Sequence, residues 1–251
     1  MRSLPRLVTS VGVTLGLGLL AAASLQPAPG VRPLPTGSLP VLVVQEVDAV
    51  SAQAYAARIG EVNRIVRAKW QIEDHVHVFQ GASAGDDSGA VFAVRRAESF
   101  AALQARNAKI EKDPELLDAR SHLAEIRKLG NQVSYKAVRF DGVHAQGAVL
   151  NTKAILTDEA AYLKALDGLR VLFDGNGLQD VKINCYRVAA GRTGWSHLIS
   201  LNCASQERRA VLMDVLGDGT WAQDWMASVN KIRTVVANGS YDEITPAAAA
   251  K

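Results

Sequence analysis

The segment Ser99–Tyr135, SFAALQARNAKIEKDPELLDARSHLAEIRKLGNQVSY, decides the fold, because the order of its elements recurs 106 positions later in Ser205–Tyr241, SQERRAVLMDVLGDGTWAQDWMASVNKIRTVVANGSY. In both segments a serine precedes a helical pattern, the pattern is interrupted, and a strand containing Ser-Tyr follows. The interruptions are Asp113-Pro114 and Gly217-Asp-Gly219. One order shared at one offset indicates an internal duplication.

The duplication extends towards the N-terminus at the same offset, where Asp74 aligns with Asp180 and the turn Ala84-Gly85 aligns with Ala190-Gly191. Each copy then has the order β-α-β-β-α-β, which is the split ferredoxin-like arrangement. Such a unit carries both helices on one face of an antiparallel sheet, and its other face needs a partner. We therefore expect an α+β fold with two ferredoxin-like repeats packed sheet to sheet as an intramolecular pseudo-dimeric barrel, in a chain that is monomeric.

The N-terminus has the three parts of an export signal. Arg2 and Arg6 give a positive start, residues 7–20 are apolar, and Ala21-Ala22-Ala23 offers a cleavage site. An uncleaved membrane anchor is the alternative, because the apolar run is nearly long enough to span a bilayer. Cleavage predicts a periplasmic or secreted protein. The expected divisions are a signal peptide at 1–23, a disordered Pro/Gly-rich tether at 24–40, repeats at 41–140 and 145–245, and a disordered tail at 246–251.

The net charge of the mature chain indicates which classes of partner to expect. Cleavage would remove two of the 28 Lys and Arg residues and none of the 25 Asp and Glu residues, which leaves the mature chain almost neutral. A nucleic-acid-binding protein would show clustered basic residues, so we expect no nucleic-acid partner. After the signal, no stretch is apolar enough to span a membrane.

Two cysteines, Cys185 and Cys203, lie on consecutive predicted strands. An oxidising compartment favours a disulfide between them, and reduced thiols in the core are the alternative. A turn centred on Arg192-Thr193 would not place them directly opposite each other.

The duplicated order and the broken second helix, at Ile110-Glu-Lys-Asp-Pro114 and Leu216-Gly-Asp-Gly-Thr220, carry a family resemblance. Over nearly all of residues 41–245 the chain resembles a tandem version of the dimeric α+β barrel superfamily, which includes antibiotic-biosynthesis monooxygenase-like and stress-responsive barrel domains. The resemblance implies a cofactor-independent oxygenase, a haem-handling protein or a protein without activity. It transfers no catalytic residue.

The second strand differs in polarity between the copies. His75 and His77 share one face of this strand, whereas the second copy has apolar residues at the matching positions and polar Asn184 and Tyr186 on the opposite face. One reading is a ligand pocket in which His75 or His77 acts as a base. The other is an edge strand whose polar residues face water.

A second set of candidates surrounds Trp195 and His197, which share one face of a predicted strand. His197 is a candidate general base, with a core histidine bonded to the backbone as the alternative. Tyr186 and Arg187 on the paired strand are placed to position an acidic or phenolic ligand. Trp225 would line a cavity between helix and sheet, and packing in the core is the alternative.

Metal chemistry has weak support, because the pair His75 and His77 needs a third ligand that no spacing supplies. We expect no metal site and no cofactor, with haem as an alternative. The function predicted is therefore an exported barrel that binds a small apolar or aromatic ligand. A cofactor-independent monooxygenase-like enzyme and a haem-binding barrel are the alternatives, and the sequence leaves open whether the protein is an enzyme.

Overall fold

The computed structural model describes residues 39–72 and 76–246. His75, the predicted signal peptide, most of the predicted tether and all but Pro246 of the predicted tail lie outside these residues. The first half contains β1 (Val41–Ala49), α1 (Ala52–Trp70), β2 (His77–Ser83), the 3-10 turn η1 (Gly85–Asp87), β3 (Val91–Ala97), α2 (Phe100–Ile110), α3 (Pro114–Ile126) and β4 (Arg127–Phe140). The second contains β5 (Ala148–Leu156), α4 (Glu159–Gly175), β6 (Lys182–Ala190), β7 (His197–Cys203), α5 (Gln206–Asp218), α6 (Thr220–Val229) and β8 (Arg233–Glu243).

Short polar caps set the starts of the helices. Ser99 and Ser205 each accept a hydrogen bond from the backbone N–H three residues later, which starts α2 and α5. Asp113 caps α3 in the same way, with Pro114 in the first turn, where no intrahelical partner is lost. Gly219 separates α5 from α6. The interruption predicted in both second helices is confirmed.

The eight strands of the described chain form a closed antiparallel barrel in the order β1-β3-β2-β8-β5-β7-β6-β4, with β4 returning to β1. The first four strands and the last four meet at two seams. At one seam Phe79 of β2 is opposite Glu243 of β8, and at the other Ala137 of β4 is opposite Tyr186 of β6. The halves therefore join through strand edges, and β2 is paired on both sides. The edge-strand reading of β2 is wrong.

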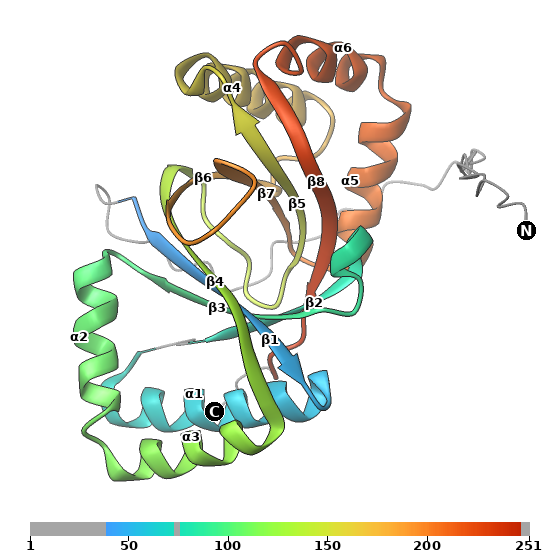
Figure 1. The fold of residues 1–251 in the computed structure, drawn as a ribbon. Helices are drawn as coiled ribbons and strands as arrows, with labels where there is room; N and C mark the ends of the chain where they lie inside the picture. The colour runs from blue at the N-terminus through green and yellow to red at the C-terminus, as the bar shows by residue number, and fades with distance from the viewer. Residues whose placement is uncertain (1–38, 73–75, 247–251) are drawn as a thin grey trace, which may run out of the picture.

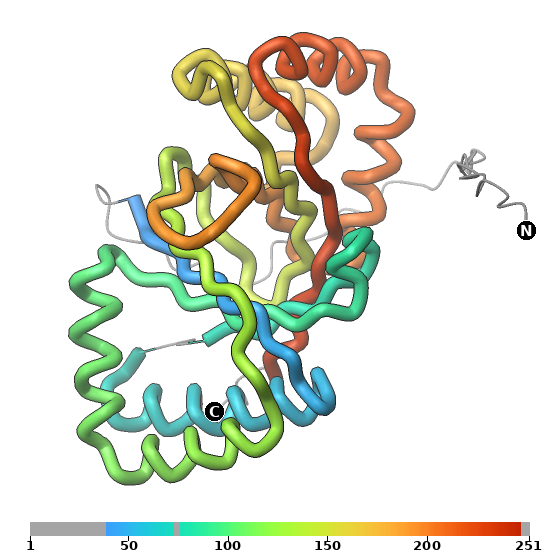
Figure 2. Tube along the Cα trace, in the orientation of Figure 1, coloured from blue at the N-terminus to red at the C-terminus, as the bar shows by residue number. Residues whose placement is uncertain are grey.

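The helices cover the barrel on two sides. Helices α1, α2 and α3 lie together on one side, and α4, α5 and α6 lie on the other (Figures 1 and 2). Each group buries an apolar core against the outer face of its strands. The fully buried large side chains of the first core include Tyr55, Val66, Leu116 and Leu123, and those of the second include Tyr162, Leu166, Phe173 and Leu212. Within residues 39–72 and 76–246, no helix combines the length and apolar character needed to cross a bilayer.

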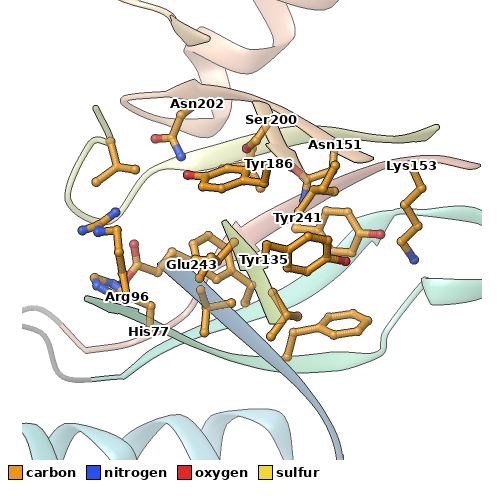
Figure 3. A pocket seen from close by; sticks show the side chains of 18 of the residues that line it. His77, Arg96, Tyr135, Asn151, Lys153, Tyr186, Ser200, Asn202, Tyr241 and Glu243 are labelled. Carbon is orange, nitrogen blue, oxygen red and sulfur yellow. The ribbon is translucent and has the colours of Figure 1, made fainter. Parts of the chain in front are cut away.

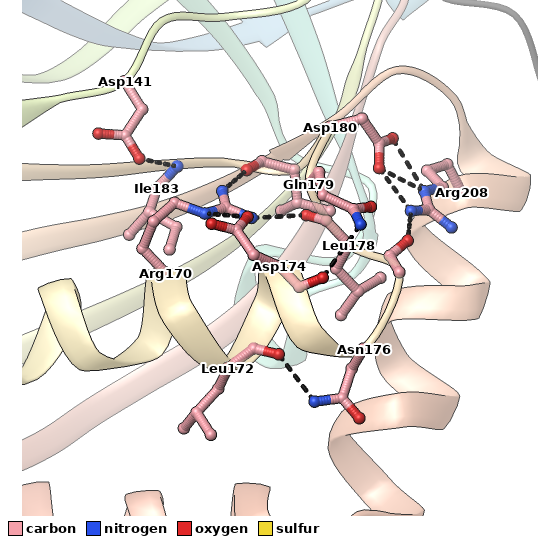
Figure 4. A network of polar contacts seen from close by, with 12 residues as sticks. Asp141, Arg170, Leu172, Asp174, Asn176, Leu178, Gln179, Asp180, Ile183 and Arg208 are labelled. Carbon is pink, nitrogen blue, oxygen red and sulfur yellow. Dashed lines mark hydrogen bonds and ion pairs between the residues drawn. The ribbon is translucent and has the colours of Figure 1, made fainter.

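Two arginines fix the connection between α4 and β6 (Figure 4). Arg170 donates to the carbonyl oxygens of Leu178 and Val181 at 2.8 and 2.6 Å, and Arg208 of α5 donates from Nε to Asp180 at 2.8 Å. Burial alone would raise the pKa of Asp180, but the contacts with Arg208 outweigh it and hold that pKa below its ordinary value. The loop is thereby fixed immediately before β6, one of the strands that line the barrel interior.

Candidate functional site

The barrel interior contains a cavity of about 120 Å³. Successive side chains of a strand point to opposite faces, so alternate residues of every strand face the interior. All eight strands contribute to the lining, together with η1 and the segment before β5. Just over half of the lining residues are aliphatic or aromatic. Asn202 and Ser200 lie along one wall (Figure 3), and the charged groups gather at two ends. An apolar cavity of about 150 Å³ is known to hold benzene, so this one suits a single aromatic ring.

The first polar end contains His77, Glu243 and Arg96. His77 Nδ1 lies 2.7 Å from Glu243 Oε1, and the two side chains are only 12% and 4% exposed. Because a carboxylate accepts hydrogen bonds, this contact places the ring proton on Nδ1 and leaves the lone pair of a neutral ring on Nε2. Arg96 lies at the same end (Figure 3), with its guanidinium carbon 5.9 Å from the centre of the Phe140 ring.

The second polar end is centred on Asp87 of η1. Its Oδ2 accepts hydrogen bonds from Lys153 Nζ at 2.6 Å and from the Tyr241 hydroxyl at 2.7 Å. Burial pushes the pKa of Asp87 upward, but these two contacts outweigh it and the pKa lies below its ordinary value. Burial and the neighbouring Asp87 carboxylate raise the pKa of Tyr241 far above its ordinary value. At neutral pH this end therefore holds a carboxylate and a neutral phenol, with the Lys153 side chain on the same carboxylate oxygen.

The other cavity tyrosines also stay neutral. Burial raises the pKa of Tyr135 to about 12, and the Tyr135 hydroxyl accepts a hydrogen bond from Trp195 Nε1 at 3.2 Å. Burial likewise raises the pKa of Tyr186 to about 12. Asn151 lies beside them, and its buried Oδ1 has no hydrogen-bond partner in the part of the chain that the structure describes. These groups can therefore donate to or accept from a ligand, but none of the tyrosines is a base at neutral pH.

Comparison with solved structures identifies the fold. The structure is similar to two proteins that carry provisional names as monooxygenases. One, from Lactobacillus acidophilus, has a TM-score of 0.53 at 8% identity, covering 82% of this chain and 95% of that one. The other, from Fusobacterium nucleatum, has a TM-score of 0.51 at 8% identity, covering 82% and 93%. The chain has the dimeric α+β barrel fold.

A chlorite dismutase from Candidatus Nitrospira defluvii is similar at a lower TM-score of 0.45 and 11% identity, covering 83% of this chain and 93% of that one. No family model matches the sequence, and no curated protein matches it significantly. The likeness to the two provisionally named monooxygenases establishes the α+β barrel fold, as the sequence predicted, and the fold alone.

Two of the predicted site residues, His77 and Tyr186, line the cavity of the α+β barrel. His75 lies outside the described residues. Asn184 is on the same face of β6 as Tyr186, but it is fully buried and holds the segment that follows β4. Its Oδ1 accepts from the Asp141 N–H at 2.9 Å, and its Nδ2 donates to the Gly142 carbonyl at 2.8 Å.

His197 faces the helices of the α+β barrel rather than its interior. Its Nε2 lies 2.7 Å from Glu159 Oε2 at the start of α4, and its Nδ1 lies 2.8 Å from Ser196 Oγ. Arg187 pairs with the same Glu159 carboxylate through two hydrogen bonds. The hydrogen bonds from Arg187 are the largest cause that lowers the pKa of Glu159, and the contact with His197 lowers it further, so this pKa lies below its ordinary value.

The contacts among Ser196, His197 and Glu159 have the composition of a hydrolase triad. However, Ser196 Oγ also accepts from the Leu156 N–H at 3.1 Å, and none of the three residues lines the cavity. This cluster therefore ties α4 to β7 and is not placed to act on a ligand held in the barrel.

Neither of the two predicted tryptophans lines the cavity. Trp195 donates to Tyr135, and Lys153 Nζ lies 4.9 Å from the centre of its ring, so Trp195 supports two lining residues without lining the cavity. Trp225 donates from Nε1 to the Ala165 carbonyl at 2.9 Å and packs in the core between α6 and α4. The space between sheet and helices, where a ligand was expected, is filled by that core.

The predicted disulfide is not formed, and Cys185 and Cys203 are separate buried thiols. The register of β6 and β7 places Cys185 opposite Ile199, four residues from Cys203 along β7. Burial raises the pKa of both thiols to about 12. Within residues 39–72 and 76–246, no group of three His, Cys, Asp or Glu side chains is arranged to hold a metal ion.

The described residues do not fit haem. The cavity accommodates one ring rather than a macrocycle built of four pyrroles. The alternative position, between the second sheet and its helices, is filled by Leu166, Phe173 and Leu212, each fully buried. His197 on that face is already engaged by Glu159 and Ser196.

Sequence reasoning missed most of the lining. It overlooked Arg96, Asp87, Lys153, Tyr241 and Glu243, which come from three strands and a turn far apart in the chain. The sequence of β7 does contain a pattern that indicates the lining face, because Ser200 and Asn202 alternate with Ile199 and Leu201. In a closed barrel the polar alternate face points inward, whereas the sequence analysis selected the face that carries His197.

Proposed function

We propose that the barrel interior binds a small ligand that contains one aromatic ring. The observation that carries this proposal is the ring-sized cavity with polar groups at two ends. Aliphatic Leu42 and Leu198 and aromatic Phe79 and Phe92 supply the apolar surface that a ring buries. The groups around Glu243 and Asp87 would orient its polar substituents, which is the usual composition of a small-molecule site.

Calorimetric titration with toluene, phenol, benzoate and benzamide tests this proposal. Ser200 lies in the cavity lining and is 8% exposed, so Ser200→Leu adds bulk to the space that the ring would occupy. We expect at least one compound to bind and this variant to lose binding by about tenfold or more. Ser228→Leu, on the exposed surface of α6, is the matched control and should bind normally. If none of the four compounds binds, or if Ser200→Leu binds like the control, the cavity is not the site.

A second candidate function is cofactor-independent oxygenation of a phenol, and the contact between His77 and Glu243 favours it. Nε2 of His77 is placed to remove a phenolic proton, with Glu243 stabilising the charged ring. The resulting phenolate would give electrons to dioxygen. One oxygen atom would stay on the ring as a quinone oxygen, and the other would leave as water.

Dioxygen consumption with simple phenols and quinols measures this activity. We expect uptake in the intact protein and its loss in His77→Ala. His197→Ala is the matched control, because His197 lies on the outer face of β7 and should leave uptake unchanged. Equal loss in the two variants, or no uptake by the intact protein while phenols bind, would rule the activity out.

We also propose that the barrel arose by duplication and forms an intramolecular pseudo-dimer. Two matched pairs support this. Arg127 donates to the Tyr55 hydroxyl at 2.8 Å in the first half, and Arg233 donates to the Tyr162 hydroxyl at 2.9 Å in the second. Each tyrosine is fully buried, and each arginine is the first residue of the last strand of its half. A monomeric mass in solution by light scattering is expected, and a stable dimer would contradict the self-sufficient barrel.

The proposed compartment rests on the N-terminal sequence alone. Arg2, Arg6, the apolar run and Ala21-Ala22-Ala23 support export with cleavage after Ala23. Mass spectrometry of the protein isolated from its own host is expected to give a chain that begins at Ser24. A chain of full length in the membrane fraction would favour the anchor instead.

A further inference from the structure

Arg96 stands out among the charged groups of the cavity because it has no carboxylate partner among the described residues. Both carboxylates of the lining are engaged elsewhere: Asp87 binds Lys153 and Tyr241, and Glu243 binds His77. The guanidinium carbon of Arg96 lies 5.9 Å from the centre of the Phe140 ring, and within residues 39–72 and 76–246 the guanidinium forms no ion pair. Among the described residues, Arg96 is therefore the one lining cation that no carboxylate balances.

An unbalanced cation in a largely apolar cavity is unfavourable for folding, because desolvation of a charge is costly without an opposite charge. The neighbouring Arg95 shows the contrast. It points to the outer face of β3, away from the cavity, and its guanidinium donates to Gln132 Oε1 at 3.3 Å. Arg96 instead lines the cavity, so its charge is directed at whatever occupies that space.

We infer that the ligand is an aromatic oxyanion, with its ring in the apolar middle of the cavity and its anionic oxygen on Arg96. This inference rests on the proposed ligand-binding function and adds the charge class of the ligand. A guanidinium presents a planar set of N–H donors that matches an oxyanion. The source of the oxygen is either a carboxylate or an ionised phenol, and both chemistries place one negative charge beside one ring.

Benzoate and benzamide separate charge from shape, because they have the same outline and differ in the charge of one substituent. We expect the intact protein to bind benzoate about tenfold or more tighter than benzamide. Arg96→Gln should remove that preference and leave benzamide affinity nearly unchanged. Arg95→Gln, which removes a charge from the outer face one residue away, should retain it.

The two sources of the oxyanion are distinguished with 4-nitrophenol, whose ionised form absorbs visible light. If the natural ligand is a phenolate, the bound probe should ionise at a lower pH than the free probe, and Arg96→Gln should abolish this shift. If it is a carboxylate, benzoate should bind with the stated preference while the bound nitrophenol shows no such shift.

The outcomes of this experiment differ from those that test the cavity itself. If neither benzoate nor benzamide binds, the proposed function fails. If both bind equally well to the intact protein, the ligand site stands and the inference about charge is overturned. This comparison uses the intact protein and needs no variant.

If Arg96→Gln proves unstable, Arg96→Lys keeps the charge and should keep a preference for benzoate over benzamide. Equal binding of the two probes to Arg96→Lys, with the preference intact in the wild-type protein, would assign the preference to another group.

Discussion

His77 and Glu243 are 166 residues apart in the sequence, yet Nδ1 of the first lies 2.7 Å from Oε1 of the second inside the barrel. The contact crosses the seam where β2 of the first half pairs with β8 of the second. It therefore exists only when both halves have folded and closed on each other. The most polar contact at this end of the cavity thus depends on the closure of the barrel.

Removal of the Glu243 carboxylate should destabilise the protein. Glu243→Ala leaves the His77 N–H without its acceptor in a space that water reaches poorly, and such a loss costs about 1–3 kcal/mol of unfolding free energy. Urea denaturation measures this cost. Glu243→Gln keeps an acceptor and should cost less. Identical urea midpoints for the two variants and the wild type would show that the contact does not contribute to stability.

Asp87→Asn should strengthen the binding of anions. The change removes the charge that neutralises Lys153, so both Lys153 and Arg96 would lack a carboxylate partner among the described residues. We expect benzoate affinity to rise several-fold, which corresponds to about 1 kcal/mol, and benzamide affinity to stay constant. Titration of both compounds into the variant checks this. A fall in benzoate affinity would mean that Asp87 positions the ligand rather than opposing its charge.

The pairing of Glu159 with Arg187 and His197 should contribute to the free energy of unfolding by an amount that depends on pH. The pKa of Glu159 is lowered in the folded state, first by Arg187, so this contribution is fully present above the unfolded-state pKa of Glu159. It is lost as the pH falls through the lower folded-state pKa. Glu159→Gln should therefore be less stable than the wild type at neutral pH, by on the order of 1 kcal/mol. The difference should shrink in acid, and a constant difference from neutral to strongly acidic pH would contradict the ion pairing.

The two thiols should be present but unreactive in the native protein. Burial raises the pKa of Cys185 and Cys203 to about 12, so the thiolate that attacks an alkylating reagent is scarce at neutral pH. Thiol titration of the purified, air-exposed protein is expected to detect almost none before denaturation and two per chain after it. Detection of none after denaturation would indicate the disulfide that the fold does not form.

Much of the fold followed from local patterns in the sequence. The serine caps at Ser99 and Ser205, the break at Asp113-Pro114 and the alternation of strand residues are all local features, and each set an element that the structure contains. The offset between Tyr135 and Tyr241 even related two residues that face the same cavity. We expected the halves to pack sheet to sheet. The patterns did not show that the halves also join through their strand edges, because the pairing of β2 with β8 depends on long-range register.

That gap explains the errors in the site. His197 was chosen because it lies among apolar residues, but the outer face of β7 is also apolar, since α4 and α5 cover it. Arg96 and Glu243 gave no signal because an isolated charge near the end of a strand normally faces water. Only closure of the barrel turns both towards a shared cavity.

The most direct test of the account is a crystal structure of the protein soaked with benzoate. We predict density for one ring inside the barrel, between Leu198 and Phe92, with its carboxylate directed at Arg96. Benzoate density between the helices and the outer face of the sheet, with the barrel interior empty, would contradict it.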